Sequence, residues 1–217
     1  MVMKIKLIIF DLDGTLVNSS IDITNALNYA VEPYGLEKLT VERTISLVGE
    51  GVTRLIEKLL GERWADLRSV VLERFLEHYS QHLTDFTVPY PGVPETLRML
   101  GNYRMAVISN KRADLSKRLL EDLRLSGFFE IIWGSDSVSE KKPSPVPVLK
   151  MIEKFSCGPE EAVLVGDSNY DIEAGKAAGV RTVAVSYGYR DAKLLQDADF
   201  IIDNMPELPS RLDILNG

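Results

Sequence analysis

Six short runs rich in apolar and β-branched residues recur along the chain, and stretches with helical character separate them. The runs cover residues 5–10, 104–108, 130–133, 162–165, 182–185 and 200–202. Their apolar residues are nearly continuous, which is typical of parallel strands buried on both faces. Because helices between such strands form right-handed crossovers, the sequence predicts an open α/β sheet with helices on both faces.

The first of these runs is separated from the others by residues 17–103, which contain no convincing strand. Apolar residues at helical spacing and two cap residues, Ser20 and Thr40, predict four helices there instead. We expect these helices at residues 21–32, from 40 toward 48, at 53–60 and at 63–83. The sequence therefore predicts a small α-helical unit inserted after the first strand.

These patterns divide the chain into two parts. We expect an open Rossmann-like parallel-sheet core from residues 1–16 and 85–217, and an inserted α-helical cap subdomain from residues 17–84. The segments 16–19 and 84–91 would be the hinges between them. Gly49-Glu50-Gly51 interrupts the cap helices, and a flexible loop at this place would face the site of the core.

Composition narrows the classes of partner. No stretch of the 217 residues reaches the roughly 20 apolar residues of a membrane span. The net charge is −7 without a basic block, which argues against nucleic acid as the main partner. The single Cys157 cannot form an internal disulfide, and no signal-peptide pattern precedes the first strand, so we expect a cytoplasmic protein. We expect a monomer or a weak homo-oligomer.

The first strand ends abruptly in Asp11-Leu-Asp-Gly-Thr15. Asp11 and Asp13 project to the same side while the backbone stays extended, and two like charges there repel each other. A divalent cation would hold such a pair ionised, and hard oxygen ligands of this kind suit Mg²⁺. Gly14 frees the backbone to turn, and Thr15 supplies a hydroxyl donor. Taken alone, the segment is equally typical of an ordinary Asp-Gly turn after a strand.

Polar residues also follow the other predicted strands, where ligands of open α/β sheets bind. Ser109 and Asn110 follow residues 105–108, and Gly166-Asp167 through Asp171 follow residues 163–165. Between them, Lys142 precedes a rigid Pro-Ser-Pro turn. Each piece alone is typical of a turn, a helix cap or a surface charge, but their shared placement at strand ends predicts one site.

In order and spacing, these segments resemble the four motifs of the haloacid dehalogenase superfamily, which are Asp11 to Thr15, Ser109-Asn110, Lys142-Pro143 and Gly166 to Asp171. The likeness spans the chain, and a helical insert after the first motif resembles the helical cap class of that family. Residues 17–27, 49–51 and 90–93 are similar to the phosphoglycolate phosphatase members. The chain departs from those members at Asn18, where they usually carry an aspartate in the hinge.

The resemblance and the chemistry of the side chains imply the same roles. Asp11 would be the nucleophile that forms an aspartyl-phosphate, and Asp13 the general acid and base. Mg²⁺ would be held by Asp11, by the backbone carbonyl of Asp13 and by Asp167, while Asp171 orders these ligands from behind. Lys142 would neutralise the transferring phosphoryl group.

The remaining predicted contacts concern the substrate. We expect Thr15, Ser109 and the backbone near Asn110 to bind phosphate oxygens, with Gly49 and Gly51 facing the substrate from the cap. Arg54 lies about one turn beyond that loop and is the candidate for a substrate carboxylate; Arg43 is the weaker alternative. His78 and His82 are spaced i, i+4, but no third metal ligand accompanies them, which favours a polar helix face.

The sequence therefore predicts a Mg²⁺-dependent hydrolase of a small phosphomonoester, with 2-phosphoglycolate as the expected substrate. Pyrophosphate and nucleoside monophosphates remain alternatives. From another class, a phosphorylatable receiver-like signalling module also uses Asp, Mg²⁺, a hydroxyl and Lys. The position of Asp11 on the first strand and the inserted cap argue against that class.

Overall fold

The structure is a computed structural model that describes residues 4–217, so residues 1–3 of the predicted core lie outside the described part. Six strands form one parallel sheet in the order β5-β4-β1-β6-β7-β8. They are β1 (Leu7–Phe10), β4 (Arg104–Ile108), β5 (Ile131–Trp133), β6 (Ala162–Gly166), β7 (Arg181–Val185) and β8 (Phe200–Ile202). The six predicted strands are confirmed, with ends that differ by at most two residues.

The strand order places β1 at the centre of the sheet. The chain adds β4 and β5 on one side of β1 and then returns to add β6, β7 and β8 on the other. Phe10, the last residue of β1, pairs in register with Val107 of β4 and Val165 of β6. The carboxyl ends of these three strands therefore lie side by side where the strand order reverses, the usual ligand position in such sheets.

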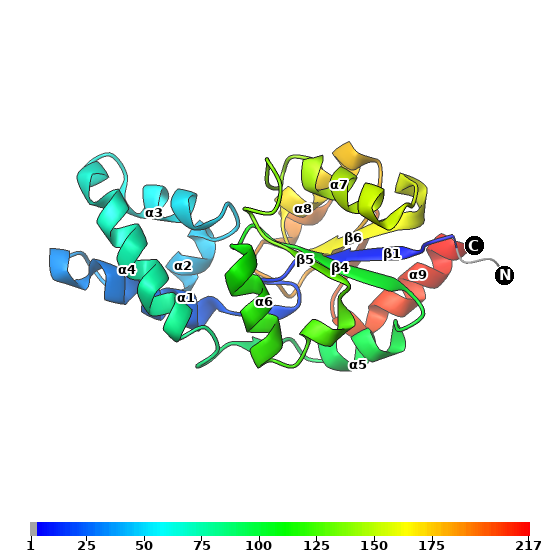
Figure 1. The fold of residues 1–217 in the computed structure, drawn as a ribbon, viewed down its shortest axis with the longest axis horizontal. Coiled ribbons are helices and arrows are strands. Elements are labelled where there is room, and N and C mark those ends of the chain that lie inside the picture. Colours follow the sequence, from blue (N-terminus) through cyan, green and yellow to red (C-terminus); the bar gives the residue numbers. More distant parts are fainter. Residues whose placement is uncertain (1–3) are drawn as a thin grey trace.

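Helices cover both faces of the sheet, as predicted (Figure 1). Alternate residues of β1 belong to different apolar clusters, because successive side chains of a strand point to opposite faces. Ile8 and Phe10 join the cluster that includes α5 (Val93–Met99), α6 (Ala113–Asp122) and α9 (Leu208–Asn216). Leu7 and Ile9 join the cluster with α7 (Val146–Phe155) and α8 (Asn169–Ala178). Both faces of β1 are thus buried, and its carboxyl end is held firmly.

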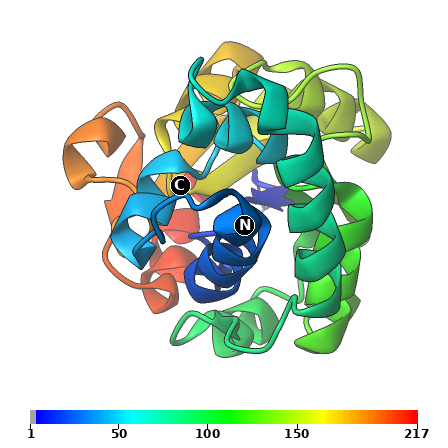
Figure 2. The ribbon, with the colours of Figure 1, turned by 90° about the vertical axis from the view of Figure 1, so that its left-hand side faces the viewer.

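Four helices lie together at the end of the molecule beyond the carboxyl ends of the strands (Figures 1 and 2). They are α1 (Ser20–Val31), α2 (Val41–Leu47), α3 (Val52–Leu60) and α4 (Arg68–Gln81). Thr40 caps α2 as predicted, since its side chain accepts a hydrogen bond from the Arg43 backbone N–H. The predicted cap at Ser20 is wrong: this residue lies inside α1, and its hydroxyl donates to Asn18 Oδ1. The cap boundaries at 17 and 84 stay a prediction.

A two-stranded antiparallel ribbon connects this helical group with the core. Its strands are β2 (Val17–Asn18) and β3 (Val88–Pro89). The expectation that residues 17–103 contain no strand is therefore wrong, because strands of two residues are too short to show an alternating pattern. Both strands fall within the segments predicted as hinges, so the entry and exit of the cap are paired with each other.

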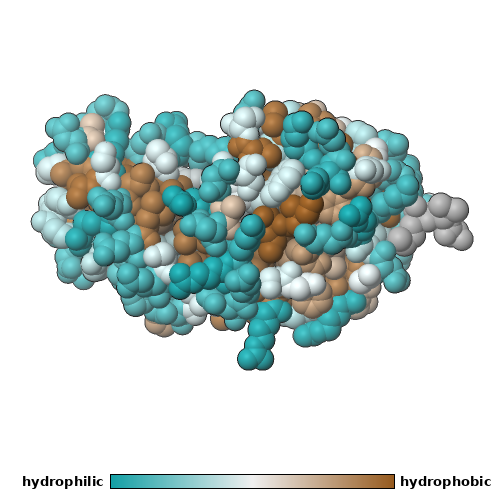
Figure 3. Space-filling model, in the orientation of Figure 1, coloured by the Kyte–Doolittle hydropathy of each residue, from teal (hydrophilic) through white to brown (hydrophobic). Residues whose placement is uncertain are grey.

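Short 3₁₀ turns complete the fold, at Glu32–Tyr34, Ala65–Leu67, Ser126–Phe128, Pro159–Glu161, Ala192–Leu195 and Met205–Glu207. Hydrophilic residues cover most of the face seen in Figure 3, with hydrophobic patches over the cap and the centre of the core. Within residues 4–217, no helix combines the length and the apolar character needed to cross a bilayer.

Candidate active site

Three buried carboxylates meet at the carboxyl edge of the sheet. Asp11 follows β1, Asp167 follows β6, and Asp171 lies in the first turn of α8. One oxygen from each lies within 4.8 Å of the others. Gly14 permits this approach, because its φ is +92° and a Cβ atom there would lie 2.2 Å from Asp167 Oδ2. Asp11 and Asp167, which lie 156 positions apart in the sequence, thus meet at the sheet edge where the strand order predicts a site.

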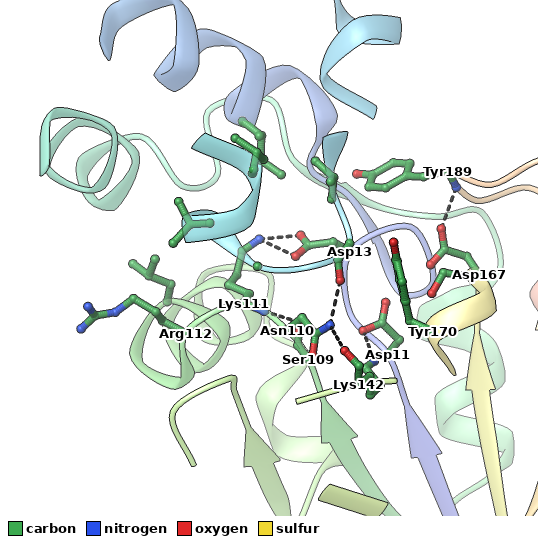
Figure 4. A pocket seen from close by; sticks show the side chains of 18 of the residues that line it. Asp11, Asp13, Ser109, Asn110, Lys111, Arg112, Lys142, Asp167, Tyr170 and Tyr189 are labelled. Atoms are coloured by element: carbon green, nitrogen blue, oxygen red, sulfur yellow. Dashed lines mark hydrogen bonds and ion pairs between the residues drawn. The ribbon is translucent and has the colours of Figure 1, made fainter. Parts of the chain in front are cut away.

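Lys142 closes one side of this group from the loop before α7 (Figure 4). Its Nζ donates to Asp11 Oδ1 at 2.6 Å, to Asp171 Oδ1 at 2.6 Å and to the Ile108 carbonyl at 2.7 Å. These three bonds use all of its N–H donors, and its side chain is 2% exposed. Burial lowers the pKa of Lys142, but the Asp11 and Asp171 carboxylates more than offset this and raise it. The ammonium therefore stays charged.

The pKa values of two of these carboxyls, Asp11 and Asp167, are raised. Burial raises the pKa of Asp11 to about 7, with Asp171 adding to the shift and Lys142 opposing it. Burial, together with the charges of Asp11 and Asp171, also raises the pKa of Asp167 well above its usual range. A bound divalent cation would offset this repulsion and keep Asp11 and Asp167 ionised. Oxygen-only ligands of this kind fit Mg²⁺.

The three carboxylates differ in how many oxygens the protein already binds. Asp171 is fully engaged, because Oδ1 accepts from Lys142 and Oδ2 accepts from the hydroxyl and the backbone N–H of Ser168. Asp167 Oδ2 accepts from the Tyr189 backbone N–H at 2.7 Å, while Thr15 Oγ1 lies at 3.5 Å from Oδ1. Asp11 Oδ2 accepts no hydrogen bond from residues 4–217 and is free to react.

The side chain of Asp13 points away from the three buried carboxylates, toward the cap. Lys111 Nζ donates to both of its carboxylate oxygens, at 2.5 and 2.7 Å, and the Ser19 hydroxyl donates to Oδ1. Lys111 Nζ also donates to Tyr79 Oη of α4 at 2.9 Å. Burial lowers the pKa of Lys111, but Asp13 and Tyr79 more than offset this and raise it. A charged lysine thus connects Asp13 with the cap (Figure 4).

Ser109 and Asn110 follow β4 and lie at the same edge. The Ser109 hydroxyl accepts from the Lys111 backbone N–H at 3.1 Å. Asn110 Nδ2 donates to the carbonyls of Gly49 at 2.8 Å and Lys142 at 2.9 Å. The side-chain amide of Asn110 therefore connects the cap loop, which is formed by residues 48–51, with the loop that carries Lys142.

The cap loop formed by residues 48–51 is bound by several side chains of the core. Arg190 donates to the carbonyls of Ile45, at 3.0 Å, and Val48. Lys141 Nζ donates to the Glu50 carbonyl at 2.5 Å, and Tyr170 Oη donates to Glu50 Oε1 at 2.6 Å. These contacts hold the loop over the carboxylates.

One pocket lies between the cap loop and the sheet edge. The predicted residues that line it are Asp11, Asp13, Gly49, Gly51, Ser109, Asn110, Lys142, Asp167 and Asp171. The cap and α6 add the apolar side chains Ile23, Leu55, Phe75, Leu76 and Leu115. Its volume is about 80 Å³. The pocket therefore joins a strongly polar floor to an apolar wall and suits a small molecule.

Comparison with known proteins identifies the family. The haloacid dehalogenase-like hydrolase family matches residues 8–185, most of the chain. The chain belongs to this family. It is 42% identical over 211 residues to a phosphoglycolate phosphatase of Aquifex aeolicus, with 96% of this chain and 97% of the relative covered. A phosphoglycolate phosphatase of Chromobacterium violaceum is 40% identical, with 94% and 95% covered. The predicted membership of the haloacid dehalogenase superfamily is confirmed, and with it that of the hydrolase class.

A solved structure gives the same fold. The crystal structure of a predicted phosphoglycolate phosphatase from Haemophilus somnus superposes with a TM-score of 0.91 at 30% identity, covering 97% of this chain and 99% of that chain. The predicted Rossmann-type α/β fold of a haloacid dehalogenase-like hydrolase is therefore confirmed. The roles predicted for single site residues stay predictions, since the structure gives their positions only.

The structure corrects the expectation for Arg54. Its side chain is 56% exposed and forms ion pairs with Glu57 at 2.6 Å and Glu50 at 3.7 Å, and it does not line the pocket. Glu50 in the preceding loop and Glu57 on α3, each about one turn from Arg54, compete for its guanidinium. Arg43 is also exposed and outside the pocket. Within the described residues, the basic side chains that line the pocket are Lys111, Arg112, Lys142 and Arg190.

Several pocket residues of this haloacid dehalogenase-like hydrolase were not predicted. Lys111 directly follows Asn110, so its place after a strand could have drawn attention to it. Tyr189 and Arg190 follow β7, and the rule that polar groups after strands form the site would have found them. Tyr79 gave no such indication, because it lies on a cap helix where its spacing is that of a packing residue. His78 and His82 stack on each other outside the pocket.

Proposed function

We propose that this protein is a Mg²⁺-dependent phosphatase that hydrolyses 2-phosphoglycolate to glycolate and phosphate through an aspartyl-phosphate on Asp11. The observation that carries the proposal is the unbonded Oδ2 of Asp11, which lies in a pocket beside a charged Lys142 and two more carboxylates. The names of the relatives from Aquifex aeolicus and Chromobacterium violaceum support the choice of substrate.

The residues present fit a divalent metal ion. Asp11 and Asp167 each have an oxygen without a short hydrogen bond from the protein, and the family resemblance adds the backbone carbonyl of Asp13. Asp171 would position the others, because both of its oxygens are already bound by Lys142 and Ser168. When bound, Mg²⁺ would supply positive charge to the phosphate oxygens and keep the neighbouring carboxylates ionised.

In the first step, a carboxylate oxygen of Asp11 attacks the phosphorus atom while the bond between phosphorus and the ester oxygen breaks. Asp13 gives a proton to the departing oxygen of glycolate, which leaves as the alcohol. Ser109 and the backbone beside Asn110 would bind the phosphoryl oxygens, and the charge of Lys142 would neutralise them, since phosphoryl transfer depends mainly on positioning and charge stabilisation. The step leaves an acyl phosphate on Asp11.

In the second step, a water molecule attacks the same phosphorus atom from the side vacated by glycolate. Asp13 takes a proton from this water, and the bond between phosphorus and Asp11 breaks to release inorganic phosphate. Asp13 is then protonated again, ready for the next substrate. Positioned acid-base catalysis of this kind contributes about 10²- to 10⁴-fold in rate. The apolar wall formed by the cap would exclude other water from the phosphoryl group.

The names of the relatives favour a small leaving group, since both refer to a two-carbon phosphoester. The pyrophosphate and nucleoside monophosphate alternatives serve as competing substrates in the test below.

The test measures phosphate release from 2-phosphoglycolate, p-nitrophenyl phosphate, pyrophosphate and AMP, with Mg²⁺ and with excess EDTA. We expect many turnovers, the highest kcat/KM with 2-phosphoglycolate, and loss of activity in EDTA. Asp11→Asn should lower kcat by at least about 10⁴-fold with unchanged circular dichroism. Retained activity in Asp11→Asn would disprove the mechanism, and a higher kcat/KM for pyrophosphate or AMP would disprove the substrate.

A further inference from the structure

Lys111 and Tyr79 form a buried polar pair that lines the pocket. The Lys111 side chain is 7% exposed and Tyr79 is 1% exposed. Neither residue is needed to hold the metal ion or the phosphoryl group. Lys111 already has Asp13 and Tyr79 as partners, so the group left to explain is the hydroxyl of Tyr79.

The pair has an unused donor. Tyr79 Oη accepts a hydrogen bond from Lys111 Nζ, and within the described residues its own O–H has no acceptor. Burial raises the pKa of Tyr79 to about 12, so the phenol keeps its proton at neutral pH. A group that accepts hydrogen bonds and carries negative charge would satisfy both the phenol and the ammonium.

The pair also lies where the leaving group would lie. Lys111 Nζ is bonded to both oxygens of Asp13, the residue proposed to protonate the ester oxygen. In 2-phosphoglycolate the carboxyl carbon is only two bonds from that oxygen. The Ser19 hydroxyl also donates to Asp13 Oδ1. One of the two N–H groups that Lys111 donates to Asp13 can therefore turn to a substrate, while the second still binds Asp13.

The other basic side chains of the pocket are less suited to this role. Lys142 is bonded to Asp11, the proposed nucleophile, so its charge lies at the phosphoryl group and not at the leaving group. Arg190 is bonded to two carbonyls of the cap. Arg112 is 46% exposed and paired with Asp114. Lys111 is therefore the buried cation that is bonded directly to Asp13.

We propose that Lys111 and Tyr79 bind a carboxylate on the leaving group, and so select phosphomonoesters that carry an acid group next to the ester carbon. Lys111 from the core supplies the charge, and Tyr79 from the cap supplies a second donor. The two parts of the molecule thus form the carboxylate site jointly. The proposal rests on the proposed phosphatase function and adds the residues that set its substrate class.

The kinetic test uses a matched pair of substrates, 2-phosphoglycolate and ethyl phosphate. Ethyl phosphate has a methyl group in the place of the carboxylate of 2-phosphoglycolate. In Lys111→Met, the ratio of their kcat/KM values should fall by about 10- to 150-fold, the range for hydrogen bonds to charged groups. Tyr79→Phe keeps the ring, which stacks on Phe75, and should lower the ratio by about tenfold. Arg112→Met is the matched control, because it removes a neighbouring cation of the same pocket and should keep the ratio.

A binding measurement separates recognition from any effect of Lys111 on Asp13. Calorimetry with Mg²⁺ compares 3-phosphonopropionate and propylphosphonate, the non-hydrolysable analogues of the two substrates. The unmodified protein should prefer 3-phosphonopropionate, and Lys111→Met should lose this preference. An unchanged preference in Lys111→Met, or an equal loss in Arg112→Met, would overturn the proposal.

If the unmodified protein hydrolyses neither ester, the phosphatase function itself fails. If it hydrolyses both equally, only the carboxylate site fails.

Discussion

The sheet edge and the cap loop face the same pocket, but they are held in different ways. At the sheet edge, a buried Lys142 binds two buried carboxylates, so each bond joins two side chains. The cap loop is bound mainly through its backbone carbonyls, which accept from Asn110, Lys141 and Arg190 of the core. The loop's own charged side chain, Glu50, is only partly buried.

This difference has consequences for substitution. An ion pair between two buried side chains depends on the identity of both, and removal of one leaves the other charged and unpaired. A hydrogen bond to a backbone carbonyl depends on the shape of the loop, and substitution of most of the loop's side chains does not remove it. We therefore expect substitutions at the sheet edge to affect both stability and chemistry, and substitutions in the cap loop to act mainly through the shape of the pocket.

The largest effect on stability is expected for Lys142→Met. The methionine fills a similar volume but leaves Asp11 and Asp171 without their shared cation, which should lower the free energy of unfolding by about 3–5 kcal/mol. Urea unfolding measures this change. Lys58→Met, which removes a cation bound to Glu50 in the cap, is the control and should change it by at most about 1 kcal/mol. Equal losses would remove the distinction between the two regions.

The next prediction concerns protons at the sheet edge. Because the pKa of Asp11 is raised to about 7, its carboxyl is mostly protonated at pH 6, and a metal ion must displace that proton. The pKa of Asp167 is shifted in the same direction. The affinity for Mg²⁺ should therefore rise as pH rises through about 7, by about tenfold per pH unit for each proton displaced. Calorimetric titrations at pH 6, 7 and 8 measure it. A Mg²⁺ affinity that is independent of pH over this range would contradict the prediction.

The sheet edge is also the region that sequence reasoning described best. Runs such as residues 162–165 are apolar throughout because β6 is buried on both faces, and that pattern depends on no distant partner. Residues that follow such strands are brought together by the topology alone, so Asp167 and Ser109 could be placed beside Asp11 before their contacts were known. Their positions were predictable because the parallel sheet determines them.

The contacts of the cap could not be predicted in the same way. Tyr79 of α4 meets Lys111 of the core because of the way the cap docks on the core, and the apolar spacing of α4 does not determine that docking. Arg54 was chosen by its distance from the loop along the sequence, whereas its direction is decided by Glu57 and Glu50 on the same surface. Contacts that depend on how separate parts of the chain pack together leave no pattern in the local sequence.

A third prediction tests whether the shape of the cap loop matters. Gly49 has a φ of +123°, and a Cβ atom there would lie 2.8 Å from Arg190 Nη2. Gly49→Ala should therefore displace the loop or Arg190 and lower kcat/KM by about tenfold, the effect of about 1.4 kcal/mol in binding. Gly61→Ala is the matched control: Gly61 also has a positive φ in the cap, but its Cβ would meet nothing within 4 Å. It should lose stability and keep kcat/KM, and an equal fall in kcat/KM would argue against the role of the loop.

The smallest effect is expected for Glu50→Gln. Hydrogen bonds from Lys58 and Tyr170 hold the pKa of Glu50 below its ordinary value of 4.5, so the carboxylate stabilises the folded state at pH above 4.5. This contribution is lost as pH falls through the lowered value, because the carboxyl is then protonated in both states. Because the pair is partly exposed, Glu50→Gln should reduce the free energy of unfolding by at most about 1 kcal/mol at pH 7. Thermal unfolding of both proteins between pH 7 and pH 3.5 should show their difference shrinking toward the acid end. A difference that grows in acid would mean that Glu50 acts as a neutral hydrogen-bonding group, and the cap loop would then be held without any contribution from charge on its own side chain.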